Sequence, residues 1–154
     1  MDKAFHEKVI ADTIALLREK DIDLYIVLTS EGSDEMAASY LPGVGTVGSG
    51  AFLFTKEGKR YAVSSSIDAQ DIEESGLMDE VVKYLRTAFD QTLAELVERL
   101  APRRVALNFS QSHPFLDGLT MGRHRRFMAA ARVSFEEVSA DTFMPEVLQA
   151  NPRR

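Results

Sequence analysis

The sequence predicts an α/β fold of three layers, in which helices cover both faces of a mixed sheet of about six strands. Segments with helical apolar spacing alternate with short apolar segments that have the composition of strands. In addition, two of these strands are separated only by Lys56-Glu57-Gly58, which predicts an antiparallel hairpin inside the sheet. The expected order of elements is α-β-(α)-β-β-α-β-α-β-α-β-α.

The chain begins with an amphipathic helix over residues 3–20, for which Asp2 can supply the N-terminal cap. Asp21 stands at the helix stop, where aspartate tolerates a left-handed backbone. Residues 22–29 are almost entirely apolar, which predicts an interior strand covered on both faces. A short helix is expected over residues 33–40, in the least regular part of the sequence.

Two strands, over residues 51–55 and 59–64, form the expected hairpin, and Gly58 is the expected positive-φ position of its turn. A short helix follows over residues 66–75 and closes at Gly76, with its acidic side chains mostly in solvent.

The second half continues the alternation. We expect strands over residues 81–85, 103–108 and 133–138. Asp90 can cap a helix that Pro102 ends, with an inward stripe made of Leu93, Leu96, Val97 and Leu100.

Residues 115–131 have helical spacing, weakened at Gly118 and Gly122. Ser139 or Asp141 can cap a final helix that turns Phe143, Val147 and Leu148 inward.

Length and composition exclude several classes of protein. A chain of 154 residues has the usual size of one domain with one core. Because the chain has no cysteine, it has no disulfide framework, no thiolate zinc site and no cysteine nucleophile. The first residues are acidic and contain no uninterrupted apolar run, so we expect neither a secretory signal nor a membrane span, and a cytoplasmic location.

The net charge is −6, and the acidity belongs to residues 1–77, which carry 7 basic and 14 acidic groups. An acidic chain repels phosphate backbones, so nucleic acid would need a local basic patch. Only Arg123-His124-Arg125-Arg126 qualifies, and a solvated or dimer-facing helix surface explains this run better. We therefore expect no nucleic-acid partner and no membrane partner.

A glycine-rich stretch, Gly43-Val44-Gly45-Thr46-Val47-Gly48, has the spacing of a dinucleotide-binding fingerprint. That fingerprint needs a strand before its first glycine and a helix after its last, because the helix N-terminus holds the pyrophosphate. Here Tyr40-Leu41-Pro42 precede the glycines and a strand follows them. The stretch is therefore interpreted as a loop that uses glycine for its backbone freedom.

No metal or catalytic set is complete. The three histidines, His6, His113 and His124, lack paired spacing, and the acids Asp68, Asp71, Glu73 and Glu74 form a solvated helix face. The run Ser64-Ser65-Ser66 lacks the flanking glycines of a nucleophile elbow, and helix capping by Ser66 explains it. We assign no catalytic residue, no metal ligand and no cofactor to this chain.

Three segments together resemble a known domain: REKDIDLYIVL, ASYLPGVGTVGSGAFLFTKEGKRYAVSSSIDAQ and the closing EEVSADTFMPEVLQANP. They are similar to the N-terminal domain of the creatinase, prolidase and aminopeptidase P family. Tyr40-Leu41-Pro42-Gly43 corresponds to the family's tyrosine-leucine-threonine-glycine piece, and Ala69-Gln70 to the end of its "DGRYxxQA" motif. The chain departs from that motif at Ser65-Ser66-Ile67-Asp68, so no role of the family's arginine is transferred.

The resemblance implies a six-stranded mixed sheet of ribonuclease H-like type over residues 1–150, with residues 151–154 beginning a linker toward a catalytic domain outside this chain. That pita-bread domain would hold a pair of divalent metal ions and hydrolyse Xaa-Pro peptides or creatine-like compounds. The chain itself is then a non-catalytic domain that supports a homodimer and walls the active site of its own or a neighbouring subunit. Candidate access or interface residues are Tyr40, Gly43, Thr46, Ser49, Ser65 and Asp68.

Two alternatives remain. In the first, the chain is a free-standing small-ligand-binding or regulatory domain. This hypothesis rests on the glycine-rich loop, which is expected beside a sheet edge, and a fold alone does not decide function. Alternatively, residues 123–126 bind nucleic acid in a salt-sensitive manner.

Overall fold

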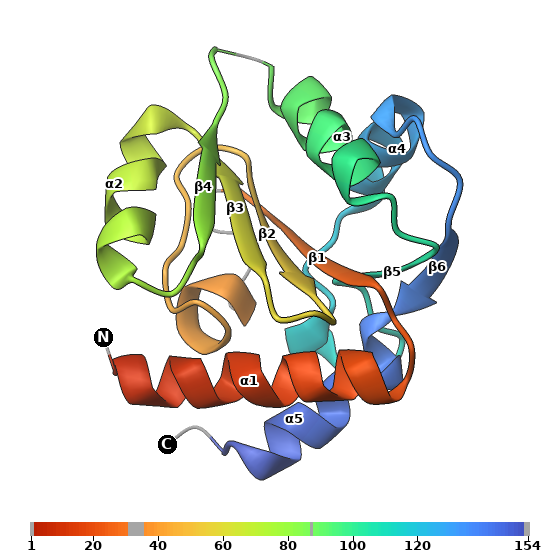
Figure 1. The fold of residues 1–154 in the computed structure, drawn as a ribbon. Helices are drawn as coiled ribbons and strands as arrows, with labels where there is room; N and C mark the ends of the chain where they lie inside the picture. The colour runs from red at the N-terminus through yellow and green to blue at the C-terminus, as the bar shows by residue number, and fades with distance from the viewer. Residues whose placement is uncertain (1, 31–35, 87, 153–154) are drawn as a thin grey trace.

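A mixed sheet of six strands forms the middle layer of the molecule (Figure 1). In the computed structural model, which describes residues 2–30, 36–86 and 88–152, the order of strands is β4-β3-β2-β1-β5-β6. β2 pairs antiparallel with β1 and β3, and the other neighbours pair parallel. The strands are β1 (Leu24–Thr29), β2 (Gly50–Thr55), β3 (Arg60–Ser64), β4 (Glu80–Lys83), β5 (Arg104–Leu107) and β6 (Glu136–Ser139). The predicted fold class and the internal hairpin are thus confirmed.

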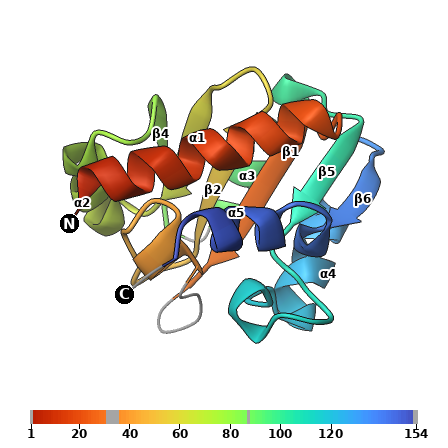
Figure 2. The ribbon, with the colours of Figure 1, turned by 90° about the horizontal axis from the view of Figure 1, so that it is seen from below.

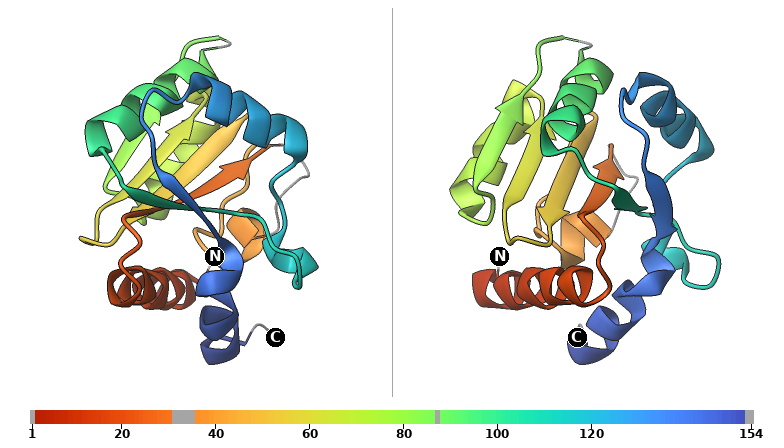
Figure 3. Two further views of the ribbon diagram at one scale, coloured as in Figure 1. Left: turned by 90° about the vertical axis from the view of Figure 1, so that its right-hand side faces the viewer. Right: turned by 45° about the vertical axis from the view of Figure 1, so that its right-hand side comes forward.

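Helices cover both faces of this sheet (Figures 1 and 3). Helix α1 (Lys3–Glu19), α2 (Ser66–Ser75) and α5 (Met144–Ala150) contribute to one core cluster, and α3 (Phe89–Leu100) and α4 (Met121–Ala130) contribute to the other. Figure 2 shows α1 and α5 side by side on their face of the sheet. None of the helices in the described ranges is long and apolar enough to cross a lipid bilayer.

Strand β1 lies in the interior, as its apolar run predicts. All six of its residues are buried. Tyr25 and Val27 pack toward α1 and α5, whereas Leu24, Ile26 and Leu28 pack toward α3 and α4. Because successive side chains of a strand point to opposite faces, one strand supplies apolar groups to both cores.

The backbone signals of the first half are confirmed. Asp2 caps α1 by accepting a hydrogen bond from the N–H of Phe5 at 3.1 Å. Asp21 and Gly58 have φ angles of +54° and +104°, as expected at the helix stop and the hairpin turn. Within the expected helix over 33–40, residues 36–40 form one π-helical turn, η1 (Met36–Tyr40), and residues 33–35 lie outside the described residues.

The helix expected over residues 115–131 is wrong over its first six residues. A 3₁₀ turn, η2 (Pro114–Leu116), comes first, and α4 starts only at Met121. Between them the chain follows the end of β5, because the Leu119 N–H donates to the Asn108 carbonyl at 2.9 Å. Asp117 accepts from the Ser110 N–H at 2.9 Å. These long-range hydrogen bonds replace the local ones that helical spacing predicts.

Three capping assignments also change. Ser65, not Ser66, caps α2, and the cap position of α3 is Ala88, with no side-chain hydrogen bond. Asp90 lies in the first turn of α3 and pairs with Arg126 of α4 at 2.7 Å instead. Ser139 caps a 3₁₀ turn, η3 (Ala140–Thr142), that leads into α5.

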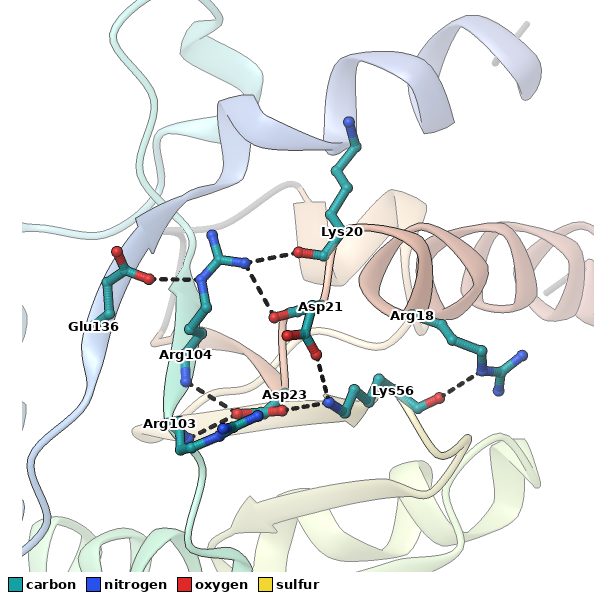
Figure 4. A network of polar contacts seen from close by, with 8 residues as sticks. All are labelled: Arg18, Lys20, Asp21, Asp23, Lys56, Arg103, Arg104 and Glu136. Atoms are coloured by element: carbon teal, nitrogen blue, oxygen red, sulfur yellow. Dashed lines mark hydrogen bonds and ion pairs between the residues drawn. The ribbon is translucent and has the colours of Figure 1, made fainter.

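A polar network holds several elements together where β1 begins (Figure 4). The Asp23 carboxylate accepts from the backbone N–H groups of Arg103 and Arg104 at 2.8 and 3.1 Å. Its other oxygen lies 2.7 Å from Nζ of Lys56, which also contacts Asp21 at 2.7 Å. The network therefore ties the end of α1 to the hairpin turn and to the start of β5.

Candidate functional site

The glycine-rich loop, residues 43–49, is held by a carboxylate at the start of α2. Asp68 Oδ1 accepts from the N–H of Val47 at 2.9 Å, and Asp68 Oδ2 accepts from the N–H of Gly48 at 3.0 Å. The Ser65 hydroxyl donates to the same Oδ2 at 3.2 Å. Paired backbone amides of this kind bind anions. Here an internal carboxylate occupies them.

The context of the loop is the one the sequence predicts. The η1 turn precedes the glycines, and strand β2 follows them, so no helix N-terminus stands at their end. A helix N-terminus does lie close by, because Asp68 sits in the first turn of α2. Its negative charge is favourable there.

Two further contacts fix the loop in place. The Thr46 and Thr29 hydroxyls lie 2.8 Å apart, and both residues are buried. The Tyr84 hydroxyl donates to the Ser49 carbonyl at 2.7 Å. Burial, together with the nearby charge of Asp68, raises the pKa of Tyr84. The loop is therefore anchored to the end of β1, to α2 and to the residue that follows β4.

Tyr40 and Gly43 contact the α1–α5 layer instead. The Tyr40 hydroxyl donates to the carbonyls of Val147 and Asn151 at 3.1 and 2.7 Å. The Tyr40 carbonyl accepts from Nδ1 of His6 at 2.8 Å. Gly43 has a φ of +68°, and a Cβ at this position would lie 2.4 Å from Nε2 of His6. Only glycine satisfies both conditions.

The six candidate residues thus form two groups. Thr46, Ser49, Ser65 and Asp68 meet around the loop and the start of α2, whereas Tyr40 and Gly43 lie against α1 and α5. Tyr40, Thr46 and Asp68 are buried, so the contacts visible here hold the loop. A role of these residues in substrate access or in an interface stays a prediction.

Exposed apolar side chains near these elements were missed by sequence reasoning. Val47, Ile67 and Leu85 are 65%, 81% and 77% exposed. Val47 is in the loop, Ile67 is in the first turn of α2, and Leu85 follows Tyr84, which holds Ser49. The available signal was an isolated isoleucine, Ile67, in an otherwise polar first turn.

The basic run on α4 is partly used within the chain. The Arg123 guanidinium donates to the carbonyls of Leu28 and Gly118, both at 2.9 Å. Arg126 pairs with Asp90 of α3 at 2.7 Å. These two arginines therefore tie α4 to the sheet and to α3.

Metal-ligating side chains do not converge. Nδ1 of His6 is committed to the Tyr40 carbonyl, and Nε2 of His124 lies 2.6 Å from Oε1 of Glu137. Within residues 2–30, 36–86 and 88–152, no group of three or more His, Asp or Glu side chains is arranged to hold a metal ion. The described residues therefore do not fit a metal pair.

The fold is similar to several solved structures, although no family model and no curated protein matches the sequence. An X-Pro aminopeptidase from Thermotoga maritima matches 92% of this chain and 35% of its own, with 20% identity and a TM-score of 0.70. The N-terminal domain of an Xaa-Pro dipeptidase from Lactobacillus brevis matches 89% of this chain and 98% of its own, with 15% identity and a TM-score of 0.68. The creatinase/prolidase N-terminal domain of an X-Pro dipeptidase from Streptococcus pyogenes matches 92% of this chain and 98% of its own, with 11% identity and a TM-score of 0.68.

These matches differ in how much of the other protein they cover. This chain spans about a third of the length of the longer peptidases, with 35% and 34% covered in two of them. It spans nearly all of the separately solved N-terminal domains. The chain has the fold of the creatinase/prolidase N-terminal domain.

Proposed function

We propose that this chain is the non-catalytic N-terminal domain of an Xaa-Pro dipeptidase or aminopeptidase P-like metallopeptidase. In this proposal it supports a homodimer and shapes access to a metal-dependent active site outside the chain. The observation that carries the proposal is the match to separately solved N-terminal domains, of which this chain covers 98%.

The side chains are consistent with a supporting role. Among the described residues, no three His, Asp or Glu side chains are arranged to hold a metal ion. The buried Thr46 bonds to Thr29, and the buried Asp68 bonds to the backbone of the glycine-rich loop. A metal pair, with the hydrolytic chemistry it supplies, would therefore belong to the catalytic domain. The part proposed for this chain is to present a rigid surface to that domain.

The proposed contact surface is the set of exposed apolar side chains Val47, Ile67 and Leu85. Exposed apolar groups that occur together often mark interaction sites. Asp68 fixes the Val47 backbone against α2, so Val47 lies on a loop that is already ordered. Preorganisation lowers the entropy cost of docking.

The first experiment measures hydrolysis by this chain alone. It is incubated with Xaa-Pro dipeptides and with manganese, cobalt or zinc, and no turnover is expected because no metal-ligating set is present in the described residues. Turnover that a chelator abolishes would overturn the proposal. Sedimentation analysis of the same sample tests the dimer.

A second experiment uses a chain that continues into the catalytic domain. Ile67→Asp should lower kcat/KM or weaken the dimer, because it places a charge in an apolar contact. Gln70→Asp, which is also exposed on α2, is the matched control and should behave like the parent protein. Equal behaviour of the two variants would remove the contact surface from the proposal.

The alternative function, a free-standing small-ligand-binding or regulatory domain, is favoured by one observation. A pocket of about 380 Å³ lies between α4 and β6, away from the glycine-rich loop. The coding sequence after residue 154 separates the two functions. Spaced Asp, Asp, His, Glu and Glu codons support the peptidase domain, and an immediate stop codon supports the binding domain.

A further inference from the structure

The pocket between α4 and β6 has the size and the walls of a ligand site. Its volume of about 380 Å³ lies within the range of small-molecule pockets, which is roughly 300–1,000 Å³. The lining residues are Phe109, Leu119, Thr120, Met121, His124 and Glu137. Apolar walls with a few polar groups are typical of sites that bind small organic molecules.

Hydrogen bonds to the backbone fix the walls of this pocket. The Leu119 N–H donates to the Asn108 carbonyl at 2.9 Å, which holds the segment before α4 against the end of β5. The Phe109 carbonyl accepts from the Ala140 N–H at 3.2 Å and from the Ser139 hydroxyl at 3.0 Å. Residues 131–135 connect α4 to β6 (Figure 3). The walls of the pocket therefore belong to regular elements and to the segments that join them.

The charged group in the pocket is Glu137. One of its carboxylate oxygens, Oε1, lies 2.6 Å from Nε2 of His124. Oε2 has no hydrogen-bond or ion-pair partner in the described part of the chain, and the Glu137 side chain is 31% exposed. An ionised carboxylate only accepts hydrogen bonds, so a ligand that binds this oxygen must bring a donor.

Three of the arginines close to this region are already engaged, and the exposed Arg125 of α4 is not among the residues that line the pocket. Arg123 donates to two carbonyls, and Arg126 and Arg104 pair with Asp90 and Glu136. None of these arginines lines the pocket. The described residues that line the pocket include one carboxylate and no arginine or lysine, so an anionic ligand would lie beside a like charge, which favours a cationic ligand.

We propose that this pocket binds a primary ammonium group carried on a compact apolar body. The ammonium donates to Oε2 of Glu137, and the apolar body lies against Phe109, Leu119 and Met121. Met121 is 69% exposed, so a ligand that covers it removes apolar surface from water. His124 holds the carboxylate in place through Oε1. This inference is independent of the peptidase function proposed above.

The same chemistry has two sources, a free arylalkylamine and the N-terminal residue of a peptide. The probes are 2-phenylethylamine and phenylalanyl-glycinamide, each titrated into the uniformly ¹⁵N-labelled 154-residue chain. The controls are 2-phenylethanol, which keeps the ring and loses the charge, and N-acetyl-phenylalanyl-glycinamide, which keeps the peptide and loses the ammonium. We expect saturable changes in the amide chemical shifts of Leu119, Met121, His124 and Glu137 with one or both amines. The controls should bind at least about tenfold more weakly.

Two pairs of variants test the assignment to this pocket. Glu137→Gln keeps an acceptor for His124 and removes the charge, and it should weaken amine binding about tenfold. Glu95→Gln, on the exposed side of α3, should leave binding unchanged. Met121→Ser should weaken binding, whereas Met128→Ser, on the same helix and outside the pocket, should not. Thermal unfolding confirms that all four variants are folded.

Several results would overturn the proposal. The first two are that neither amine causes a saturable shift, or that an amine and its uncharged control bind equally. The other two are that the shifts are confined to other parts of the molecule, or that Glu137→Gln leaves amine binding unchanged. If only phenylalanyl-glycinamide binds, the ligand is a peptide N-terminus, and if only 2-phenylethylamine binds, it is a free amine. Both of these results support the ammonium site.

Discussion

At the scale of single residues, Asp68 determines the conformation of the glycine-rich loop. Its two oxygens accept hydrogen bonds from the N–H groups of Val47 and Gly48, and the residue as a whole is 5% exposed. A buried carboxylate without these donors would lose solvation with no compensation. The loop and the start of α2 therefore stabilise each other.

Asp68→Asn should lower the free energy of unfolding by about 1–3 kcal/mol, because the amide that replaces one oxygen would face an N–H donor. Chemical denaturation measures this loss, and hydrogen exchange at Val47 and Gly48 should become faster. Asp71→Asn is the matched control, since Asp71 is exposed on the same helix. Unchanged exchange at the two loop amides would show that Asp68 does not hold the loop.

Sequence reasoning identified Asp68, Ser65 and the loop as a region but did not predict how they pair. Asp68 and Val47 are 21 residues apart, and only the packing of α2 beside the loop brings them together. Likewise, the basic run suggested an outward patch, whereas Arg123 reaches the Leu28 carbonyl across 95 residues of sequence. Residue types are visible in a sequence, but contacts of this separation depend on the register of the sheet.

At the scale of elements, the polar network around Asp23 joins helix α1, the hairpin turn and β5 (Figure 4). Burial raises the pKa of Asp23, but hydrogen bonds from Lys56 and from the Arg103 and Arg104 amides outweigh it, so the net shift is downward. The hydrogen bond from Lys56 also lowers the pKa of Asp21. Lys56 in turn has a raised pKa, because both carboxylates stabilise its charge.

This network predicts a loss of stability in acid. A carboxylate with a lowered pKa in the folded state contributes stability above its unfolded pKa, about 3.9, and loses it as the pH falls through the folded value. The melting temperature of the parent protein should therefore fall below about pH 4. Asp23→Asn should be less stable at pH 7 and should show a shallower decline. Asp71→Asn should follow the parent curve, and a parallel curve for Asp23→Asn would contradict this assignment.

Elements with strong local signals were predicted, and those set by distant contacts were not. The helix α1 and the hairpin have their own caps, turns and apolar periodicity, and both formed as expected. Helix α4 begins six residues later than expected because Leu119 pairs with Asn108, which belongs to another segment. Apolar periodicity does not contain that competing hydrogen bond.

At the scale of the whole molecule, Tyr40 connects the start, the middle and the end of the chain. Its carbonyl contacts His6 of α1, and its hydroxyl contacts Val147 and Asn151 at the end of α5. Burial, assisted by the charge of Asp12, raises the pKa of Tyr40 to about 12. The neutral hydroxyl is thus the form that fits the folded protein.

This pKa predicts a loss of stability at alkaline pH. Tyrosine in the unfolded chain ionises near pH 10, whereas folded Tyr40 keeps its proton to about pH 12. The stability contributed by Tyr40 is therefore complete below pH 10 and is lost as the pH rises toward 12. Tyr40→Phe should lose about 1 kcal/mol at pH 7 and decline less above pH 10. Tyr61→Phe is the control, and ultraviolet titration of the tyrosines provides an independent measurement.

The overall fold could be predicted because it depends on the alternation of helices and strands and on a hairpin with its own turn residues. The pocket between α4 and β6 could not, since its shape depends on how these two consecutive elements pack beside each other and against Phe109. His124 and Glu137 line the pocket and lie 2.6 Å apart, yet the sequence shows only a histidine in a basic run and one of two neighbouring glutamates.

Helix α1 begins the described fold and α5 ends it, and both lie in the same helical layer (Figures 1 and 2). Phe109 and Leu119 of the pocket pack with the other layer, that of α3 and α4. A tag or a surface attachment at either end of the chain would therefore leave the α4–β6 pocket facing the solution. The domain can be immobilised on a sensor chip in this orientation, so its amine ligands can be sought by direct binding measurements.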